Sequence, residues 1–110
     1  MIQGLGIDVV EVARIERAMR RPRFLERILT PGERETELTP ARVAGRWAAK
    51  EAAAKAIALS LTWQDVEVIH DASGRPLLKF ATPLHGTRVH LSISHERGLA
   101  AAVVVVETAY

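Results

Sequence analysis

Two acidic side chains and one lysine could do chemistry together. Asp8 ends an apolar stretch near the start of the chain, and Glu51 lies among alanines, four positions before Lys55. A carboxylate beside apolar residues is unfavourable unless it is solvated, hydrogen-bonded or bound to a cation. Two carboxylates suit Mg²⁺, which takes one or two protein carboxylates and completes its shell with water and phosphate oxygens. We therefore interpret Asp8 and Glu51 as magnesium ligands, with the Lys55 ammonium directed at the same phosphates, as phosphoryl or phosphodiester transfer requires.

Each of these residues also has a simpler interpretation. Asp8 could cap the helix that follows it, and Glu51 and Lys55 could form an ordinary surface pair on one helix. His95 ends Ser92–His95 at a strand-to-turn junction, where its side chain could reach a cleft or merely serve the turn. The other histidines, His70, His85 and His90, are predicted to be structural.

The composition limits the class of protein. The chain has 110 residues, 48% of them apolar and 25% charged, so we expect one globular domain, residues 1–110. The absence of cysteine excludes disulfides, thiolate metal sites and cysteine nucleophiles. There is no signal-peptide pattern at the start, and the longest apolar run, residues 99–106, is too short to cross a bilayer. We expect a cytosolic protein that does not enter membranes.

Arginines gather between residues 14 and 27. The net charge is only +2, yet this window holds Arg14, Arg17, Arg20, Arg21, Arg23 and Arg27 against Glu16 and Glu26 alone. Such a patch favours a negatively charged partner, although it could also be a solvated helix face. A basic nucleic-acid-binding module is therefore a second function class, but aromatic residues make up only 5% of the chain and no helix-turn-helix is visible.

The elements that must position these residues follow an α+β order. The apolar periodicity predicts one strand, then helices, then antiparallel strands. A row of alanines on the longest helix, Ala44, Ala48, Ala52 and Ala56, is small enough for a sheet or helix to pack very close. The predicted segments are a strand over 2–10 ending near Asp8, helices over 11–20 and 22–29, a capping box at 30–33, a long helix from 39–40 to about Leu59, and hairpins from 65–70 with 76–80 and from 87–94 with 99–106.

These segments resemble the acyl-carrier-protein synthase family of 4′-phosphopantetheinyl transferases. The resemblance runs in one order along almost the whole chain, which makes it far more specific than any single motif. The matching residues are Gly6–Glu11, Phe24–Thr30, Gly45–Ala52 with Lys55, Gly74–Pro76 and His90–His95.

The resemblance implies a reaction and roles for individual residues. The chain would move the 4′-phosphopantetheine arm of coenzyme A onto a serine of apo acyl carrier protein, releasing adenosine 3′,5′-bisphosphate. Asp8 and Glu51 would hold Mg²⁺ against the pyrophosphate of coenzyme A, and Lys55 would neutralise or protonate the leaving phosphate. Glu51, directly or through a metal-bound water, would take the serine proton. Arg46 and His95 would contact the phosphates of coenzyme A.

The resemblance also implies partners. Members of this length form homotrimers with active sites shared between neighbouring subunits, and they dock the acidic carrier protein on the first helix. Arg14 matches a docking position, whereas Arg17 and Arg21, like Arg20 and Arg23, match by location.

The chain departs from the family pattern after Lys55. The usual glycine-rich loop is absent, since residues 56–63 contain no glycine, and the segment between Thr30 and Gly45 is short. No coenzyme A contact of that loop is carried over. A non-catalytic subunit that binds coenzyme A or carrier protein is the remaining alternative.

Overall fold

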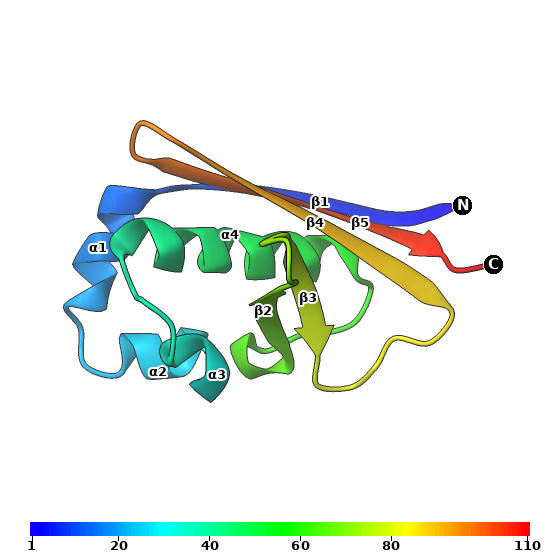
Figure 1. Ribbon diagram of the computed structural model, residues 1–110, viewed down its shortest axis with the longest axis horizontal. Coiled ribbons are helices and arrows are strands. Elements are labelled where there is room, and N and C mark those ends of the chain that lie inside the picture. Colours follow the sequence, from blue (N-terminus) through cyan, green and yellow to red (C-terminus); the bar gives the residue numbers. More distant parts are fainter.

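A three-stranded antiparallel sheet lies along one side of a long helix (Figure 1). The computed structural model describes all residues, 1–110. The strands β1 (Ile2–Glu11), β4 (Thr87–Glu96) and β5 (Leu99–Thr108) are arranged in the order β1-β5-β4, so that β1 and β4 are the two edges. Helix α4 (Pro40–Ala56) packs under this sheet. The predicted α+β class, with a small antiparallel sheet on a long helix, is confirmed.

The remaining elements cover the other side of α4 (Figure 1). The strands divide into two sheets, because the first predicted hairpin forms a separate two-stranded sheet instead of extending the larger one. No helix of the structure is long and apolar enough to cross a membrane. The elements of this second layer are α1 (Val12–Met19), α2 (Phe24–Ile28), α3 (Pro31–Arg34), the short 3₁₀ helix η1 (Trp63–Asp65), β2 (Val66–His70) and β3 (Pro76–Phe80).

Strand β1 and helix α4 meet backbone to backbone. A Cβ atom on Gly4 would lie 1.9 Å from the carbonyl oxygen of Ala56, and one on Gly6 would lie 2.0 Å from that of Ala52. Both alanines are buried. The prediction that this alanine row allows very close packing is therefore confirmed. On the strand side, the close contact requires that Gly4 and Gly6 have no Cβ atom.

The starts of two helices follow the predicted capping signals. Thr39 Oγ1 accepts a hydrogen bond from the Arg42 amide at 3.2 Å, which starts α4 directly before Pro40. At α3 the Thr30 hydroxyl accepts from the Glu33 amide at 3.2 Å, while the Glu33 carboxylate accepts from the Thr30 amide at 2.8 Å. This reciprocal pair is the predicted capping box.

Several boundaries differ from the predictions; β4 and β5, for example, each run two residues beyond their predicted ends, to Glu96 and Thr108. Three of the differences have a local cause. Helix α4 ends at Ala56 and not near Leu59, because Ile57 turns to an extended conformation and is buried in the core. Helix α2 starts at Phe24 and not at Pro22, since Arg23 before it has a positive φ of 66°. Strand β1 continues past Asp8 to Glu11, which becomes the N-cap of α1 without a side-chain hydrogen bond. The interpretation of Asp8 as a helix cap is therefore wrong.

Candidate active site

Asp8 and Lys55 are in contact at the β1 edge of the sheet. Lys55 Nζ donates to the carbonyl oxygen of Ile7 at 2.9 Å and lies 3.4 Å from Asp8 Oδ1. The Asp8 side chain is only 16% exposed, whereas that of Lys55 is 54% exposed. Glu51 is half-buried and lies one helical turn before Lys55 on the same helical face.

The glycines of β1 explain why Asp8 reaches this place. Gly4, Gly6 and Asp8 alternate along the strand and face the helix, and the first two lie opposite Ala56 and Ala52. Asp8 is the next inward-facing residue after Gly6. It therefore lies about one further turn along α4, toward the turn that carries Glu51. The close strand–helix contact therefore decides how near Asp8 comes to the polar face of α4.

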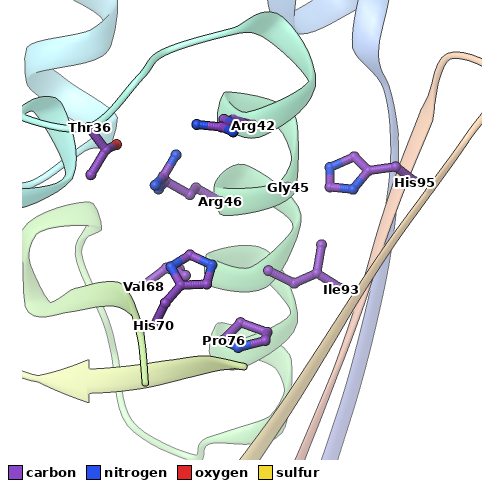
Figure 2. A pocket seen from close by; sticks show the side chains of 9 residues that line it. All are labelled: Thr36, Arg42, Gly45, Arg46, Val68, His70, Pro76, Ile93 and His95. Carbon is purple, nitrogen blue, oxygen red and sulfur yellow. The ribbon is translucent and has the colours of Figure 1, made fainter. Parts of the chain in front are cut away.

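A cleft of about 500 Å³ opens between α4, the β2–β3 hairpin and β4 (Figure 2). We call it the arginine cleft. Arg42 and Arg46 project from α4, while His95 and Ile93 approach from β4 on the other side of Gly45 (Figure 2). Of the three residues predicted to contact phosphates, Arg46 and His95 line it, and Lys55 does not. The full lining is Thr36, Arg42, Gly45, Arg46, Val68, His70, Pro76, Ile93 and His95.

His95 is held against α4 by one hydrogen bond and one glycine. Its Nε2 lies 2.9 Å from the carbonyl oxygen of Ala41. A carbonyl oxygen only accepts, so Nε2 carries the proton in this contact. A Cβ atom on Gly45 would lie 3.0 Å from Nε2, and the glycine therefore provides the space that the imidazole occupies.

Arg46 is buried with part of its guanidinium unpartnered. The residue is 6% exposed, and its Nε has no hydrogen-bond partner. Burial lowers the pKa of Arg46 from its ordinary value, Glu33 raises it and Arg42 lowers it further. A buried guanidinium donor without a partner, beside a second arginine, suits an anionic ligand because charge-assisted hydrogen bonds to oxyanions are strong.

Two basic residues of this cleft, Arg42 and His70, are not predicted from the sequence as ligands. Arg42 lies one helical turn before Arg46, so the helical spacing could have indicated it. His70, for which a structural role is predicted, lines the same cleft near Arg46 (Figure 2). No sequence signal connects His70 with Arg46, since they come together only because the β2–β3 hairpin packs beside α4.

The arginines of α1 are exposed, and one of them contacts Trp47 of α4. Helix α1 buries Ile15 and Ala18 and leaves Arg14 and Arg17 on its outer surface. The Arg14 guanidinium lies 5.6 Å from the centre of the Trp47 ring, within the range of a cation–π contact. Trp47 precedes Glu51 by one turn of α4, so the basic surface of α1 borders the Glu51 side of the helix.

The predicted site residues form two groups on opposite flanks of α4. Asp8 and Lys55 lie at β1, one edge of the sheet, while His95 belongs to β4, the other edge, with β5 between them. Arg46 lies with His95. One copy of the chain therefore does not bring the Arg46–His95 pair together with Asp8, Glu51 and Lys55.

Comparison with known proteins identifies the family. The profile of the 4′-phosphopantetheinyl transferase superfamily matches residues 4–104. The chain belongs to this family. It is 51% identical to the holo-[acyl-carrier-protein] synthase of Solidesulfovibrio magneticus, over 97% of this chain and 99% of the relative. It is 49% identical to that of Geobacillus kaustophilus, over 97% and 90%.

Solved structures agree with this assignment. The holo-(acyl-carrier-protein) synthase of Bacillus anthracis in complex with CoA (3′,5′-ADP) matches with a TM-score of 0.87 and 41% identity, over 99% of both chains. The holo-[acyl-carrier-protein] synthase of Neisseria meningitidis matches with a TM-score of 0.87 and 34% identity, over 98% of this chain and 100% of that one. The family predicted from the resemblance is confirmed, which favours an enzyme over a nucleic-acid-binding module.

Proposed function

We propose that this chain transfers 4′-phosphopantetheine from coenzyme A to a serine of apo acyl carrier protein, releasing adenosine 3′,5′-bisphosphate. Its relatives are named for the synthesis of the holo carrier protein, and one solved relative holds a coenzyme A nucleotide. The observation in this molecule that carries the proposal is the contact of Lys55 with Asp8, one helical turn from Glu51. The Asp8 carboxylate and the Lys55 ammonium lie together, and the Glu51 carboxylate belongs to the helical turn before Lys55. These are the groups that phosphate transfer needs.

The donor set at this point fits Mg²⁺. Asp8 and Glu51 offer carboxylate oxygens, and Mg²⁺ binds through one or two carboxylates together with water and substrate phosphates. Lys55 Nζ already places a positive charge 3.4 Å from Asp8 Oδ1, so the carboxylate lies in a position to pair with a cation. Asp8 and Glu51 would hold the ion, which supplies charge neutralisation for the pyrophosphate of coenzyme A when it is bound.

The residues of the chain then have distinct tasks. Lys55 is half-exposed and free to leave Asp8, so its ammonium donates to the phosphate that departs with the adenosine. Glu51 accepts the proton of the attacking serine hydroxyl. Arg46 and His95, in the arginine cleft, bind phosphate groups of coenzyme A.

A homotrimer would unite the two groups. The outward face of the large sheet is apolar: Leu5, Ile7 and Val9 of β1 are 64%, 61% and 58% exposed, and their register partners on β5 are Val105, Val103 and Ala101. A continuous exposed apolar face of this kind favours association. Packing copies through this face covers it and lets the Asp8 group of one copy face the Arg46 group of its neighbour. Val103→Lys should give a monomer in light scattering, and this monomer should be inactive.

The carrier protein docks on α1 and on the turn that follows it, which carries Arg21. An acidic partner is attracted by Arg14, Arg17 and Arg21, and such complementarity acts mainly on the association rate and weakens with salt. Reversing the charge at Arg14 and Arg21 should raise the KM for the carrier much more than the KM for coenzyme A. An equal change in both constants would contradict docking on this surface.

Mass spectrometry tests the activity directly. Apo carrier protein is incubated with this chain, coenzyme A and Mg²⁺, and we expect a gain of one phosphopantetheine per carrier. Glu51→Gln should abolish the gain. Glu35→Gln is the matched control, because Glu35 is exposed and its side chain makes no hydrogen bond or ion pair in the structure. Absence of modification by the unsubstituted chain would disprove the proposed function.

A further inference from the structure

Lys50, the residue before Glu51, holds its charge in the interior of the molecule. Its side chain is 3% exposed. Lys50 Nζ donates to the carbonyl oxygen of Ile28 at 2.8 Å, to Glu33 Oε1 at 2.6 Å and to the carbonyl oxygen of Trp63 at 2.9 Å. An ammonium has three donors and no acceptor, so every proton of Lys50 is in use. Lys50 is therefore not the group that takes the serine proton.

The counterion of Lys50 is equally fixed. The Glu33 side chain is 0% exposed. Its Oε1 also accepts from the Thr30 amide at 2.8 Å, and its Oε2 accepts from the Val68 amide at 2.8 Å. Burial lowers the pKa of Lys50 from its ordinary value, and Glu33 opposes that change through a hydrogen bond and its charge. The pair joins α3, α4 and β2 through fully matched hydrogen bonds.

A second cleft, of about 360 Å³, lies beside Glu51, and we call it the Glu51 cleft. One wall belongs to α4 and consists of Lys50, Glu51 and Ala54. The opposite wall consists of Leu61, Thr62, Trp63 and Val66.

Lys50 connects these two walls. The hydrogen bond from its Nζ to the Trp63 carbonyl crosses from α4 to the opposite wall. The Trp63 ring also packs against Trp47, with ring centres 4.5 Å apart, one turn before Glu51. The Glu51 carboxylate makes no hydrogen bond or ion pair in the structure, so the walls of the cleft are what limit its positions.

We propose that Lys50 is a positioning residue for the transfer reaction: by holding the Trp63 carbonyl it fixes the wall opposite Glu51, and so the direction in which the Glu51 carboxylate points. The inference rests on the proposed function. A displacement of about 1 Å in a reacting group can lower a rate by about 100-fold, so the loss of this hydrogen bond should be visible in kcat.

The decisive variant removes both charges of the pair. Lys50→Met with Glu33→Gln leaves no unpaired buried charge, and replacing a buried ion pair by neutral groups of similar volume often preserves the fold. We expect a folded protein by circular dichroism and urea unfolding, with kcat lowered between about tenfold and about 100-fold. The KM for the carrier should stay within about threefold of the original, because the surface of α1 is not changed.

Thr30→Val is the matched control. It removes the Thr30 hydroxyl bonds to Glu33 and Glu67 but leaves the three hydrogen bonds of Lys50 intact. Its kcat should therefore match that of the unsubstituted chain even though its stability is reduced. An equal fall of kcat in Thr30→Val would mean that lost stability, and not lost positioning, explains the double variant.

The outcomes separate the inference from the proposed function. An unchanged kcat in the folded double variant refutes the positioning role while leaving the transfer activity established. If the double variant does not fold, Lys50→Arg provides the test, because the guanidinium keeps its charge toward Glu33 but its planar donors do not converge on three acceptors. A lowered kcat in Lys50→Arg supports the role, and an unchanged one refutes it. An unsubstituted chain that modifies no carrier refutes both.

Discussion

Lys50 and Lys55, both on α4, differ in how their ammonium groups are surrounded. Lys50 is 3% exposed and donates to three acceptors, all supplied by the protein. Lys55 is 54% exposed and has one carbonyl at 2.9 Å and a longer contact of 3.4 Å with Asp8. An ammonium that donates all three of its protons to protein acceptors has none left for a ligand, whereas an ammonium with an unused proton can bind one. The surroundings of each lysine, and not its residue type, therefore assign its role.

The largest expected effect is on stability, at Lys50. Lys50→Met leaves Glu33 buried without its counterion, and breaking a buried pair in this way costs about 3–5 kcal/mol. Urea unfolding of the variant and the unsubstituted chain measures the difference. Lys55→Met should change the free energy of unfolding by less than about 1 kcal/mol, as is usual for exposed pairs. Equal losses at both positions would remove the contrast between the two lysines.

The next effect is on the reaction, at Lys55. Lys55→Met should lower kcat by between about 100-fold and about 1,000-fold, the range found when one group that stabilises developing charge is removed. The rate of carrier modification at saturating coenzyme A measures it. Lys79→Met, at an exposed lysine of β3, should leave the rate unchanged and is the control. A normal rate for Lys55→Met would show that the Lys55 ammonium does not assist the reaction by donating to the substrate phosphate.

A smaller effect on stability and on kcat is expected at Gly6, in the part of β1 that places Asp8 beside Lys55. Gly6→Ala places a Cβ 2.0 Å from the carbonyl oxygen of Ala52, so the strand must move away from the helix. Overpacking of this kind costs about 1–3 kcal/mol and should also lower kcat, because Asp8 moves with the strand. Lys79→Met, at the exposed lysine of β3 away from the outward face of the large sheet, should have little effect on kcat. Thermal unfolding and turnover of both variants check this.

The smallest expected effect is on the stability of the protein at acid pH. The Asp71 carboxylate accepts from the Ser73 hydroxyl and from the Arg75 and Ser73 amides, and these bonds lower its pKa from the ordinary 3.8. Its stabilising contribution is therefore present above pH 3.8 and is lost as the pH falls through the lower folded value. Asp71→Asn should flatten the fall of the melting temperature in this acid range. The interior Lys50–Glu33 pair is untouched by this change.

The sequence predicts the elements around α4 better than the contacts between them. The Thr39–Pro40 start, the capping box at Thr30 and the close-packed alanine face all depend on residues within a few positions of one another, and all are found. The burial of Lys50 depends on partners 13, 17 and 22 residues away, which only the folded chain brings together. In the helical pattern Lys50 looks like Lys55, a charge beside Glu51, and nothing local distinguishes them.

The same limit applies to the clefts. Arg46 and His95 are found from a family motif, whereas His70 depends on how the β2–β3 hairpin lies beside α4. The end of α4 at Ala56 also has a tertiary cause, because the core draws in Ile57 where helix propensity alone would continue. The local pattern identifies which residues carry charge, and the tertiary packing decides which of these charges remain available to a ligand.

The contact of Trp47 with Trp63 gives the molecule a built-in optical probe. These are the only 2 tryptophans of the chain, and they share a single contact that borders Glu51. Excitation of indole thus reports on one location, without signal from elsewhere in the fold. Coenzyme A, divalent ions and carrier protein can each be titrated by following this emission, with no label attached and no residue exchanged.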